Sequence, residues 1–196
     1  MDQLLSYLAI HFDLPILDWI AENLYCAFLD AVMPLITLLG DAGIFWILIA
    51  VVFLLIPRYR KTGLAMGAAF LIGLLICNVT MKPLVARIRP YDFQLEHFGK
   101  NIKLLVATPH DFSFPSGHTL ASFEAATAIM IRSKKAGIPA MALACLIAFS
   151  RMYLYVHYPT DVLFSVVMGI GIAFAANRLV NKGWDLYQAN ALKKSP

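Results

Sequence analysis

Three polar clusters interrupt an otherwise apolar chain, and their residue types could bind an anion and transfer a proton. They are the segment from Lys82 to Pro90, the tetrapeptide Pro115-Ser116-Gly117-His118, and a third group of Ser150, Arg151, His157 and Asp161. Cationic side chains hold phosphoryl oxygens, and imidazoles exchange protons near neutral pH. Such a combination is the equipment for cleaving a phosphate ester without a metal ion.

The first cluster holds three cations, Lys82, Arg87 and Arg89, at the end of an apolar segment. Snorkelling, in which a long cationic side chain reaches the lipid headgroups, accounts for any one of them. Three together are better explained by a bound phosphate, because Arg offers a planar fork of donors and Lys a mobile charge. Since Arg87 and Arg89 are two residues apart, they point apart on a helix, and we expect one of them to serve the headgroup region.

The second cluster stands where a helix is expected to begin. Helix N-termini present free N–H groups that favour an anion, and Gly117 lets the backbone approach that anion closely. Ser116 on its own supports no more than a helix N-cap. His118, at the membrane edge, favours a functional site, because a histidine there can give a proton near neutral pH.

The third cluster places His157 and Asp161 four residues apart, a spacing that stacks two side chains on one face of a helix. The carboxylate can then accept a hydrogen bond from one imidazole nitrogen and leave the other free for attack. Pro159 indicates a turn that enters the next apolar segment, with Asp161 near its start, so a plain N-cap is the alternative role for Asp161. Arg151 would add a further phosphate contact.

Composition places these clusters in a membrane. Of 196 residues, 60% are hydrophobic and only 14% are charged, which is less charge than the surface of a soluble domain needs. The net charge of +4 comes from short basic clusters between apolar runs and does not indicate nucleic-acid binding. Cys26, Cys77 and Cys145 lie at unrelated spacings in apolar stretches, which predicts core residues and no disulfide framework or zinc site. We expect no cleaved signal, because the chain starts without a basic region.

We predict an all-α, polytopic membrane bundle of about five spans in a single domain. The spans are expected at 43–56, 64–81, 116–131, 137–155 and 161–176. Asp13, Asp18, Glu22 and Asp30 recur among apolar residues, so residues 1–42 are expected to form interfacial helices beside a membrane core at 43–182; a sixth crossing is the alternative. Glu124 lies inside a span, where an ionisable residue indicates a function; the alternative, which we favour, is a protonated carboxyl or a hydrogen bond from Asn78 or Ser122.

Basic residues give the orientation. They gather at 58–61, at 132–135 and in the C-terminal tail, and five spans put these regions on one side, which the positive-inside rule assigns to the cytoplasm. The three polar clusters then fall on the extracytoplasmic side, where residues 91–114 form an outer loop long enough to cover a pocket. We therefore expect a multi-pass protein with a cytoplasmic C-terminus.

The three clusters resemble the signature of the type 2 phosphatidic acid phosphatase (PAP2) superfamily, which includes lipid phosphate phosphatases, glucose-6-phosphatase and vanadium haloperoxidases. Its pattern, Lys-x6-Arg-Pro, Pro-Ser-Gly-His and Ser-Arg-x5-His-x3-Asp, is matched without a gap between Lys82 and Asp161. The resemblance implies a PAP2/haloperoxidase-like core in which His157 is the nucleophile of a phosphohistidine intermediate, Asp161 orients it, and His118 is the acid. It also implies a set of phosphate-binding residues: Lys82, Arg89, Ser116, Gly117, Ser150 and Arg151. Because phosphoryl transfer depends mostly on positioning and charge stabilisation, we expect no metal and no cofactor.

The chain's small size resembles the bacterial branch of the family, which implies a lipid phosphate of the cell membrane as substrate. An outward site favours undecaprenyl diphosphate, whose dephosphorylation recycles the cell-wall carrier, over phosphatidylglycerophosphate or phosphatidate. The alternative from a different class is a transporter or scaffold that binds an anionic lipid without turnover; it would need the cations but not His118 and the His157–Asp161 pair. The membrane spans disfavour a haloperoxidase-like oxidant. The sequence does not indicate an oligomeric state.

Overall fold

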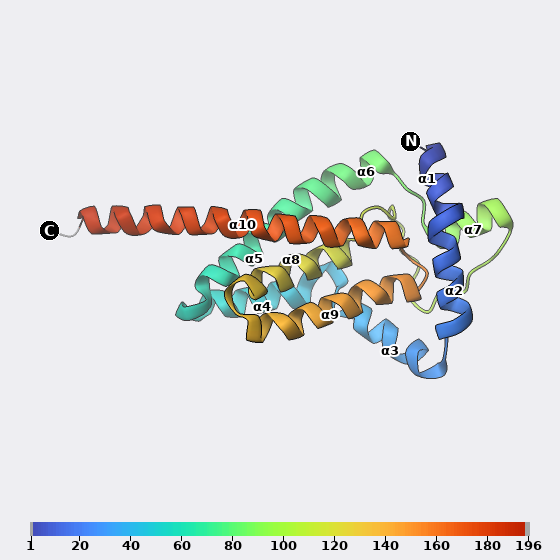
Figure 1. Ribbon diagram of the computed structural model, residues 1–196, viewed down its shortest axis with the longest axis horizontal. Coiled ribbons are helices and arrows are strands. Elements are labelled where there is room, and N and C mark those ends of the chain that lie inside the picture. Colours follow the sequence, from blue (N-terminus) through green and yellow to red (C-terminus); the bar gives the residue numbers. More distant parts are fainter. Residues whose placement is uncertain (1, 195–196) are drawn as a thin grey trace.

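The computed structural model describes residues 2–194, and all regular structure in this range is helical, which confirms the all-α prediction. In chain order, with η marking 3₁₀- or π-helical segments, the elements are α1 (Asp2–Leu8), η1 (Ala9–Asp13), α2 (Leu14–Leu24), α3 (Ala27–Leu38), η2 (Asp41–Gly43), α4 (Ile44–Leu55), η3 (Pro57–Tyr59), α5 (Arg60–Gly73), η4 (Leu74–Met81), α6 (Lys82–Val85), α7 (Pro90–Phe98), α8 (Gly117–Arg132), α9 (Lys134–Tyr153) and α10 (Pro159–Lys194). Figure 1 shows the long helices side by side along one axis, with α1 and α2 lying across one end.

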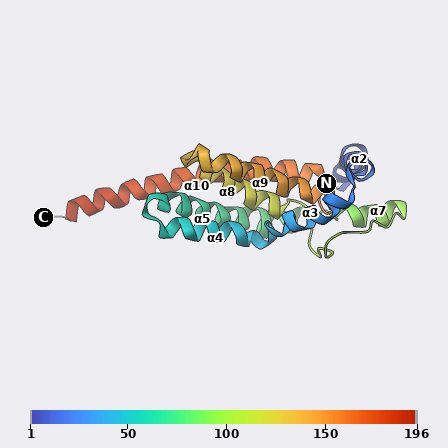
Figure 2. The same cartoon turned by 90° about the horizontal axis from the view of Figure 1, so that it is seen from below.

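The bundle is built from α4, α5 with its continuation η4, α8, α9 and α10. Seen from below in Figure 2, α4 and α5 form one layer, and α8, α9 and α10 lie above them. Helix α8 contacts α4, α5, α9 and α10, so it is the centre of the bundle. Its fully buried alanines, Ala125, Ala126 and Ala128, allow this because small side chains let neighbouring helices approach closely.

Several helices are long and apolar enough to cross a membrane. Within the described residues these are Gln3–Leu24, a part of Pro57–Phe98, Lys134–Tyr153 and Pro159–Ala191, with a further span if Ala27–Leu38 and Asp41–Leu55, bent by 42°, count as one. Helix α8 is shorter, at 16 residues, yet lies inside the bundle. Gln3–Leu24 runs roughly perpendicular to the bundle in Figure 1, which is the arrangement expected of interfacial helices. The chain is therefore a multi-pass membrane protein.

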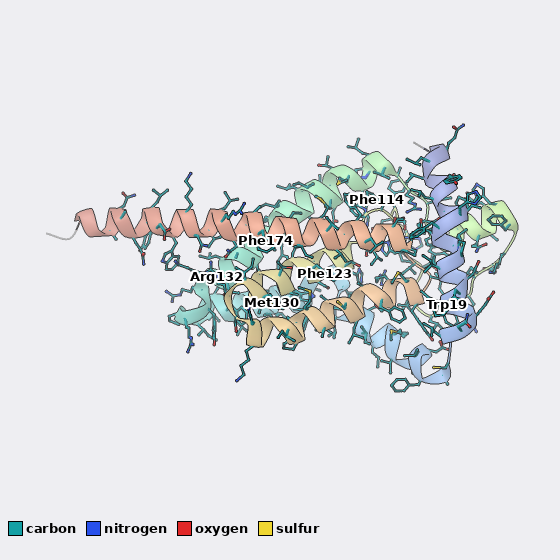
Figure 3. The ribbon with its side chains drawn as sticks, in the orientation of Figure 1. Trp19, Phe114, Phe123, Met130, Arg132 and Phe174 are labelled. Carbon is teal, nitrogen blue, oxygen red and sulfur yellow. The ribbon has the colours of Figure 1, made fainter. Side chains whose placement is uncertain are left out.

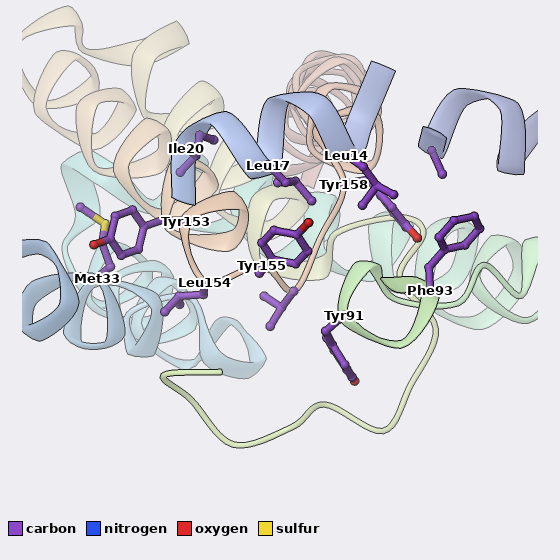
Figure 4. Packing of buried hydrophobic residues seen from close by; sticks show 12 residues of the cluster. Leu14, Leu17, Ile20, Met33, Tyr91, Phe93, Tyr153, Leu154, Tyr155 and Tyr158 are labelled. Carbon is purple, nitrogen blue, oxygen red and sulfur yellow. The ribbon is translucent and has the colours of Figure 1, made fainter. Parts of the chain in front are cut away.

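Helix α2 packs onto the turn that follows α9. Figure 4 shows Leu14, Leu17 and Ile20 of α2 lying over the aromatic turn formed by Tyr153, Leu154, Tyr155 and Tyr158. The opposite face of α1–α2 exposes Leu4, Tyr7, Ile10, Phe12 and Trp19. These helices thus expose apolar side chains as well as burying them, and their Asp13 is fully buried.

The two ends of the bundle differ in character. Figure 3 shows Trp19 of α2 at one end, where α1, η1 and α2 lie across the bundle (called the crossing helices below), and Arg132 at the far end of α8. Arg132 donates to Asn177 and Asn181 of α10, each at 2.7 Å, which closes the bundle at this end. The end near Trp19 carries the polar clusters and is called the site end below.

Candidate functional site

A cavity of about 890 Å³ at the site end joins the three polar clusters. Its polar part is lined by Lys82, Arg89, Gly117, His118, Arg151 and His157. The cavity continues between helices to an apolar part lined by Ile47, Phe70, Leu74 and Leu120. The structure therefore brings together polar residues that are up to 75 positions apart in the sequence, from Lys82 to His157.

His157 lies in the tight turn between α9 and α10. Tyr155 adopts a left-handed conformation with φ of 59°, and the backbone N–H of His157 donates to the Arg151 carbonyl at 3.3 Å. The imidazole Nδ1 lies 3.4 Å from Ser113 Oγ and 3.6 Å from Asp161 Oδ2. Its Nε2 lies 3.4 Å from an Arg89 guanidinium nitrogen. One ring nitrogen thus faces a carboxylate and the other faces a cation.

Asp161 lies in the first turn of α10 and is fully buried. Its Oδ1 accepts from Arg87 at 2.6 Å, and its Oδ2 accepts from Ser113 Oγ at 2.5 Å and from the Tyr158 N–H at 3.1 Å. Asp161 is thus held from three sides, beside the His157 ring.

The prediction that Arg87 or Arg89 serves the headgroup region was wrong, because both side chains are buried in the site. Helix α6 ends after four residues, and Ala86 follows in a left-handed conformation with φ of 48°. The chain leaves the helix at that point, so the expectation that two arginines two residues apart diverge on a helix does not apply. Both side chains turn into the protein and meet different partners.

His118 is the second residue of α8, and its Nε2 lies 2.7 Å from Asp41 Oδ1. Asp41 begins the turn η2, where Ala42 and Gly43 have positive φ values of 47° and 67°. Gly40 provides the space for the imidazole, since a Cβ at this position would lie 2.7 Å from His118 Cδ2. Sequence reasoning missed Asp41; its only signal was a Gly- and Asp-containing break between two apolar runs.

Asp111, in the loop between α7 and α8, occupies the two cations of the first cluster. Arg89 donates to its Oδ1 at 2.5 Å and to its carbonyl at 2.8 Å, and Lys82 forms an ion pair with its Oδ2. Burial alone would raise the pKa of this carboxyl, but the hydrogen bonds from Lys82 and Arg89 lower it to about 2. The Asp111 side chain is 56% exposed, so it can leave these cations for water. Sequence reasoning missed this residue too.

Arg151 is the cation of the cavity that lacks a counter-ion. It is 5% exposed, it donates to Thr37 Oγ1 at 2.5 Å, and its Nε has no hydrogen-bond partner. In the part of the chain that the structure describes, Arg151 forms no ion pair with a carboxylate, unlike Lys82, Arg87 and Arg89. A buried charge is costly unless it is paired, so this guanidinium favours an anion in the cavity.

The same cations act on His157, whose ring is 2% exposed. Burial, followed by the positive charges of Arg89 and Arg151, holds the pKa of His157 well below its usual value. The ring is therefore neutral at physiological pH, which is the form that can attack an electrophile.

The remaining predicted residues differ in their placement. Gly117 lines the cavity. Ser116 Oγ bonds Thr119 Oγ1 at 3.0 Å and Ser150 Oγ donates to the Ile147 carbonyl at 2.6 Å, so both hydroxyls are directed into helices. Their role as phosphate ligands stays a prediction.

Glu124 corrects another expectation. Its predicted partner Ser122 accepts from Trp46 Nε1 at 3.0 Å instead, and Glu124 Oε1 has no hydrogen-bond partner. The carboxyl group lies against Gly73 and lines the apolar part of the cavity.

Across residues 2–194, no group of three His, Cys, Asp or Glu side chains is arranged as metal ligands. Of the carboxylates near the cavity, Asp111 pairs with Lys82 and Arg89, Asp161 with Arg87, and Asp41 with His118, whereas Glu124 lies in the apolar part.

Comparisons with known proteins agree with this geometry. Residues 62–185 match the family model described as the PAP2 superfamily. The chain is 31% identical over 139 residues to an undecaprenyl-diphosphatase of Sulfolobus acidocaldarius, covering 70% of this chain and 65% of that protein. It is 32% identical over 146 residues to an undecaprenyl-diphosphatase of Bacillus subtilis, covering 74% and 72%. Its identity to phosphatidylglycerophosphatase B of Bacillus subtilis is 31% over 170 residues, covering 80% and 75%.

Two solved structures have the same fold. LpxE of Aquifex aeolicus superposes with a TM-score of 0.72 at 24% identity, covering 85% of this chain and 94% of that one. A transmembrane PAP2 type phosphatidylglycerolphosphate phosphatase of Bacillus subtilis gives 0.68 at 25% identity, covering 92% and 94%.

Proposed function

Because the chain belongs to the PAP2 superfamily, we propose that it is a membrane lipid phosphatase that works through a phosphohistidine intermediate. The observation that carries this proposal is the buried guanidinium of Arg151, which has no carboxylate partner among the described residues and lies beside His157 in the cavity. A phosphate group supplies the missing negative charge. It would lie within reach of the neutral imidazole.

In the first step, His157 Nε2 attacks the phosphorus. The P–N bond forms while the bond from the terminal phosphorus to the leaving oxygen breaks; this is the bridging oxygen of a diphosphate or the ester oxygen of a monophosphate. His118 gives its proton to that leaving oxygen. Asp161 stabilises the His157 ring as it becomes cationic. Lys82, Arg89 and Arg151 stabilise the charge on the phosphoryl oxygens, which is the main requirement of phosphoryl transfer.

In the second step, water attacks the phosphohistidine. His118, now neutral, takes a proton from the water, and the P–N bond breaks as inorganic phosphate forms. His157 returns to its neutral state and His118 to its protonated state. Asp41 Oδ1, 2.7 Å from His118 Nε2, can accept a hydrogen bond from the protonated ring.

A lipid substrate accounts for the shape of the cavity. The cationic part takes the phosphate, and the part lined by Ile47, Phe70 and Leu74 takes the first segment of an apolar tail. Because these residues lie on helices of the bundle, the tail would extend from the site toward the bilayer.

The site faces the extracytoplasmic side in this proposal. The support is the basic residues at the opposite end of the bundle, which the positive-inside rule places in the cytoplasm. They are Arg58, Arg60, Lys61, Arg132, Lys134, Lys135, Arg178 and Lys182. The C-terminal part of α10 extends beyond that end (Figure 1) and would be cytoplasmic.

Undecaprenyl diphosphate is the proposed substrate, with undecaprenyl phosphate as the product. An outward site suits it because the spent wall carrier is left on the outer face, and two relatives are named undecaprenyl-diphosphatases. Phosphatidylglycerophosphate and phosphatidate are the second choice, supported by the relative named phosphatidylglycerophosphatase B. No metal ion takes part in the proposed reaction.

The test is phosphate release by the purified protein in detergent, with and without EDTA. Undecaprenyl diphosphate, farnesyl diphosphate, phosphatidylglycerophosphate and phosphatidate are compared. We expect strong turnover of the two diphosphates in the presence of EDTA. Turnover of only the two glycerolipids would overturn the proposed substrate. Loss of all turnover in EDTA would overturn the metal-free mechanism. His157→Ala should release no phosphate. A chain that only binds anionic lipid would show no turnover before the substitution and unchanged lipid affinity after it.

A further inference from the structure

Asp13 connects the crossing helices to the centre of the site, although it lies outside the segment that matches the family model. Its side chain is fully buried at the boundary of η1 and α2. Its Oδ2 accepts from Arg87 at 2.7 Å, and its Oδ1 accepts from the Thr160 N–H at 2.9 Å. Asp13, from the crossing helices, thus lies against Thr160, the residue that precedes Asp161.

Arg87 bridges two carboxylates with its two terminal nitrogens. One nitrogen donates to Asp13 Oδ2 at 2.7 Å and the other to Asp161 Oδ1 at 2.6 Å. The guanidinium also stacks on the Tyr158 ring at 3.7 Å, so its plane is fixed. The result is a continuous row of contacts, Asp13 to Arg87 to Asp161, ending 3.6 Å from His157 Nδ1.

The charges in this row decide how much negative charge Asp161 can offer to the His157 ring. If Arg87 were paired with Asp161 alone, the two charges would cancel, and the carboxylate would offer little stabilisation to a cation on His157. With Asp13 on the other side of the guanidinium, two negative charges share one positive charge. Asp161 then keeps negative charge for the His157 ring, which becomes cationic when it is phosphorylated.

We propose that Asp13 is a positioning residue for the histidine step, which acts through Arg87 on the orientation and charge of Asp161. This inference rests on the proposed function, since its effect appears in the rate of phosphoryl transfer. Asp13 does not line the cavity. Its removal should therefore slow turnover without weakening substrate binding.

Asp18 provides a matched control on the same helix. It accepts from Tyr155 Oη at 2.9 Å and forms an ion pair with Lys100 at 2.9 Å, so it also anchors α2 to the body of the protein. No contact leads from Asp18 to Asp161 in the described residues. Asp18→Asn thus loosens the helix without changing the charge next to the catalytic carboxylate.

The experiment measures kcat and KM of the full chain in detergent with farnesyl diphosphate and dioctanoyl phosphatidate. Asp13→Asn should lower kcat about tenfold and change KM by less than twofold, as for a pair of residues in one charged network. Asp18→Asn should keep kcat within about twofold, while both variants lower the melting temperature. Equal loss of kcat in the two variants would overturn the inference, because helix docking alone would then explain the effect.

A second variant keeps the test decisive if Asp13→Asn does not fold. Arg87→Lys keeps the positive charge, but a single ammonium group cannot bridge both carboxylates in the same way. We expect about a tenfold lower kcat with nearly unchanged KM. An unchanged kcat in Arg87→Lys would refute the bridging role of Arg87 and leave the proposed function intact. If the unsubstituted protein shows no turnover, both the proposed function and this role are refuted.

Discussion

Removal of the Asp111 carboxylate should make the site bind phosphate more tightly. In the structure Asp111 pairs with both Lys82 and Arg89, which are two of the proposed phosphate ligands. A substrate or product phosphate must therefore displace this carboxylate. Because Asp111 is largely exposed, each pair is worth on the order of 0.5 kcal/mol, so the two together cost about 1 kcal/mol. Since 1.4 kcal/mol corresponds to a tenfold change, Asp111→Asn should tighten phosphate binding roughly fivefold.

The assay is competitive inhibition by inorganic phosphate during hydrolysis of farnesyl diphosphate. Asp111→Asn should lower the inhibition constant of phosphate roughly fivefold and lower KM in the same direction. Glu96→Gln is the matched control, because it removes an exposed carboxylate of α7 that does not line the cavity. An inhibition constant that stays the same or rises in Asp111→Asn would refute this reasoning. Asp111 would then orient Lys82 and Arg89 for phosphate and would not compete with it.

Three further predictions concern the histidines. His118→Ala should slow the hydrolysis of phosphatidate by on the order of 10²-fold or more and slow the hydrolysis of farnesyl diphosphate much less. The reason is that a leaving alkoxide needs a proton more than a leaving phosphate does. Equal losses of phosphate release with the two substrates would contradict this. Gly40→Ala places a Cβ 2.7 Å from His118 Cδ2 and should lower kcat about tenfold, whereas Gly67→Ala, with open space around the new Cβ, should leave kcat unchanged. Because burial, then Arg89 and Arg151, lower the pKa of His157, its ring stays neutral as the pH falls through 6.5. The acidic limb of kcat/KM, corrected for ionisation of the substrate, should thus lie well below pH 6.5 and move upward in Arg151→Gln; a limb at 6.5 in both proteins would contradict the assignment.

The cations and imidazoles could be predicted from the sequence because the rest of the chain is so apolar. A charged residue in such a chain must lie at a membrane edge or in a polar site within the protein, so Lys82, His118 and His157 stand out against their surroundings. Counting the spans between them puts all three at the same end of a bundle. The structure agrees, with the three clusters lining one cavity.

The partners of these residues could not be predicted, because they lie in turns and loops whose paths depend on tertiary packing. Asp41 reaches His118 through a turn with two successive positive φ values, and Asp111 reaches Arg89 from a loop that no periodicity constrains. Arg87 was misinterpreted for a related reason. The left-handed Ala86 ends α6 early, and alanine gives no signal of that conformation in a sequence.

Asp13 marks a different limit. A helical pattern of polar and apolar residues predicts that a helix has a polar face, but not whether water or protein covers that face. Asp13 and Trp19 both belong to the crossing helices, yet the first is fully buried and the second is 56% exposed. Interfacial placement of α1–α2 stays a prediction, and the burial of the Asp13 carboxylate gave no signal in the sequence.

The charge around His157 differs between the cavity and the opposite side of its ring. In the cavity, Lys82, Arg89 and Arg151 contribute three positive charges against two negative charges from Asp111 and Asp41. On the Nδ1 side, Asp13 and Asp161 contribute two negative charges against one positive charge from Arg87. Before substrate binds, burial and the excess of cations keep the ring neutral. In the proposed reaction a phosphate neutralises those cations, and the carboxylates behind the ring then stabilise the positive charge that the ring acquires as the P–N bond forms.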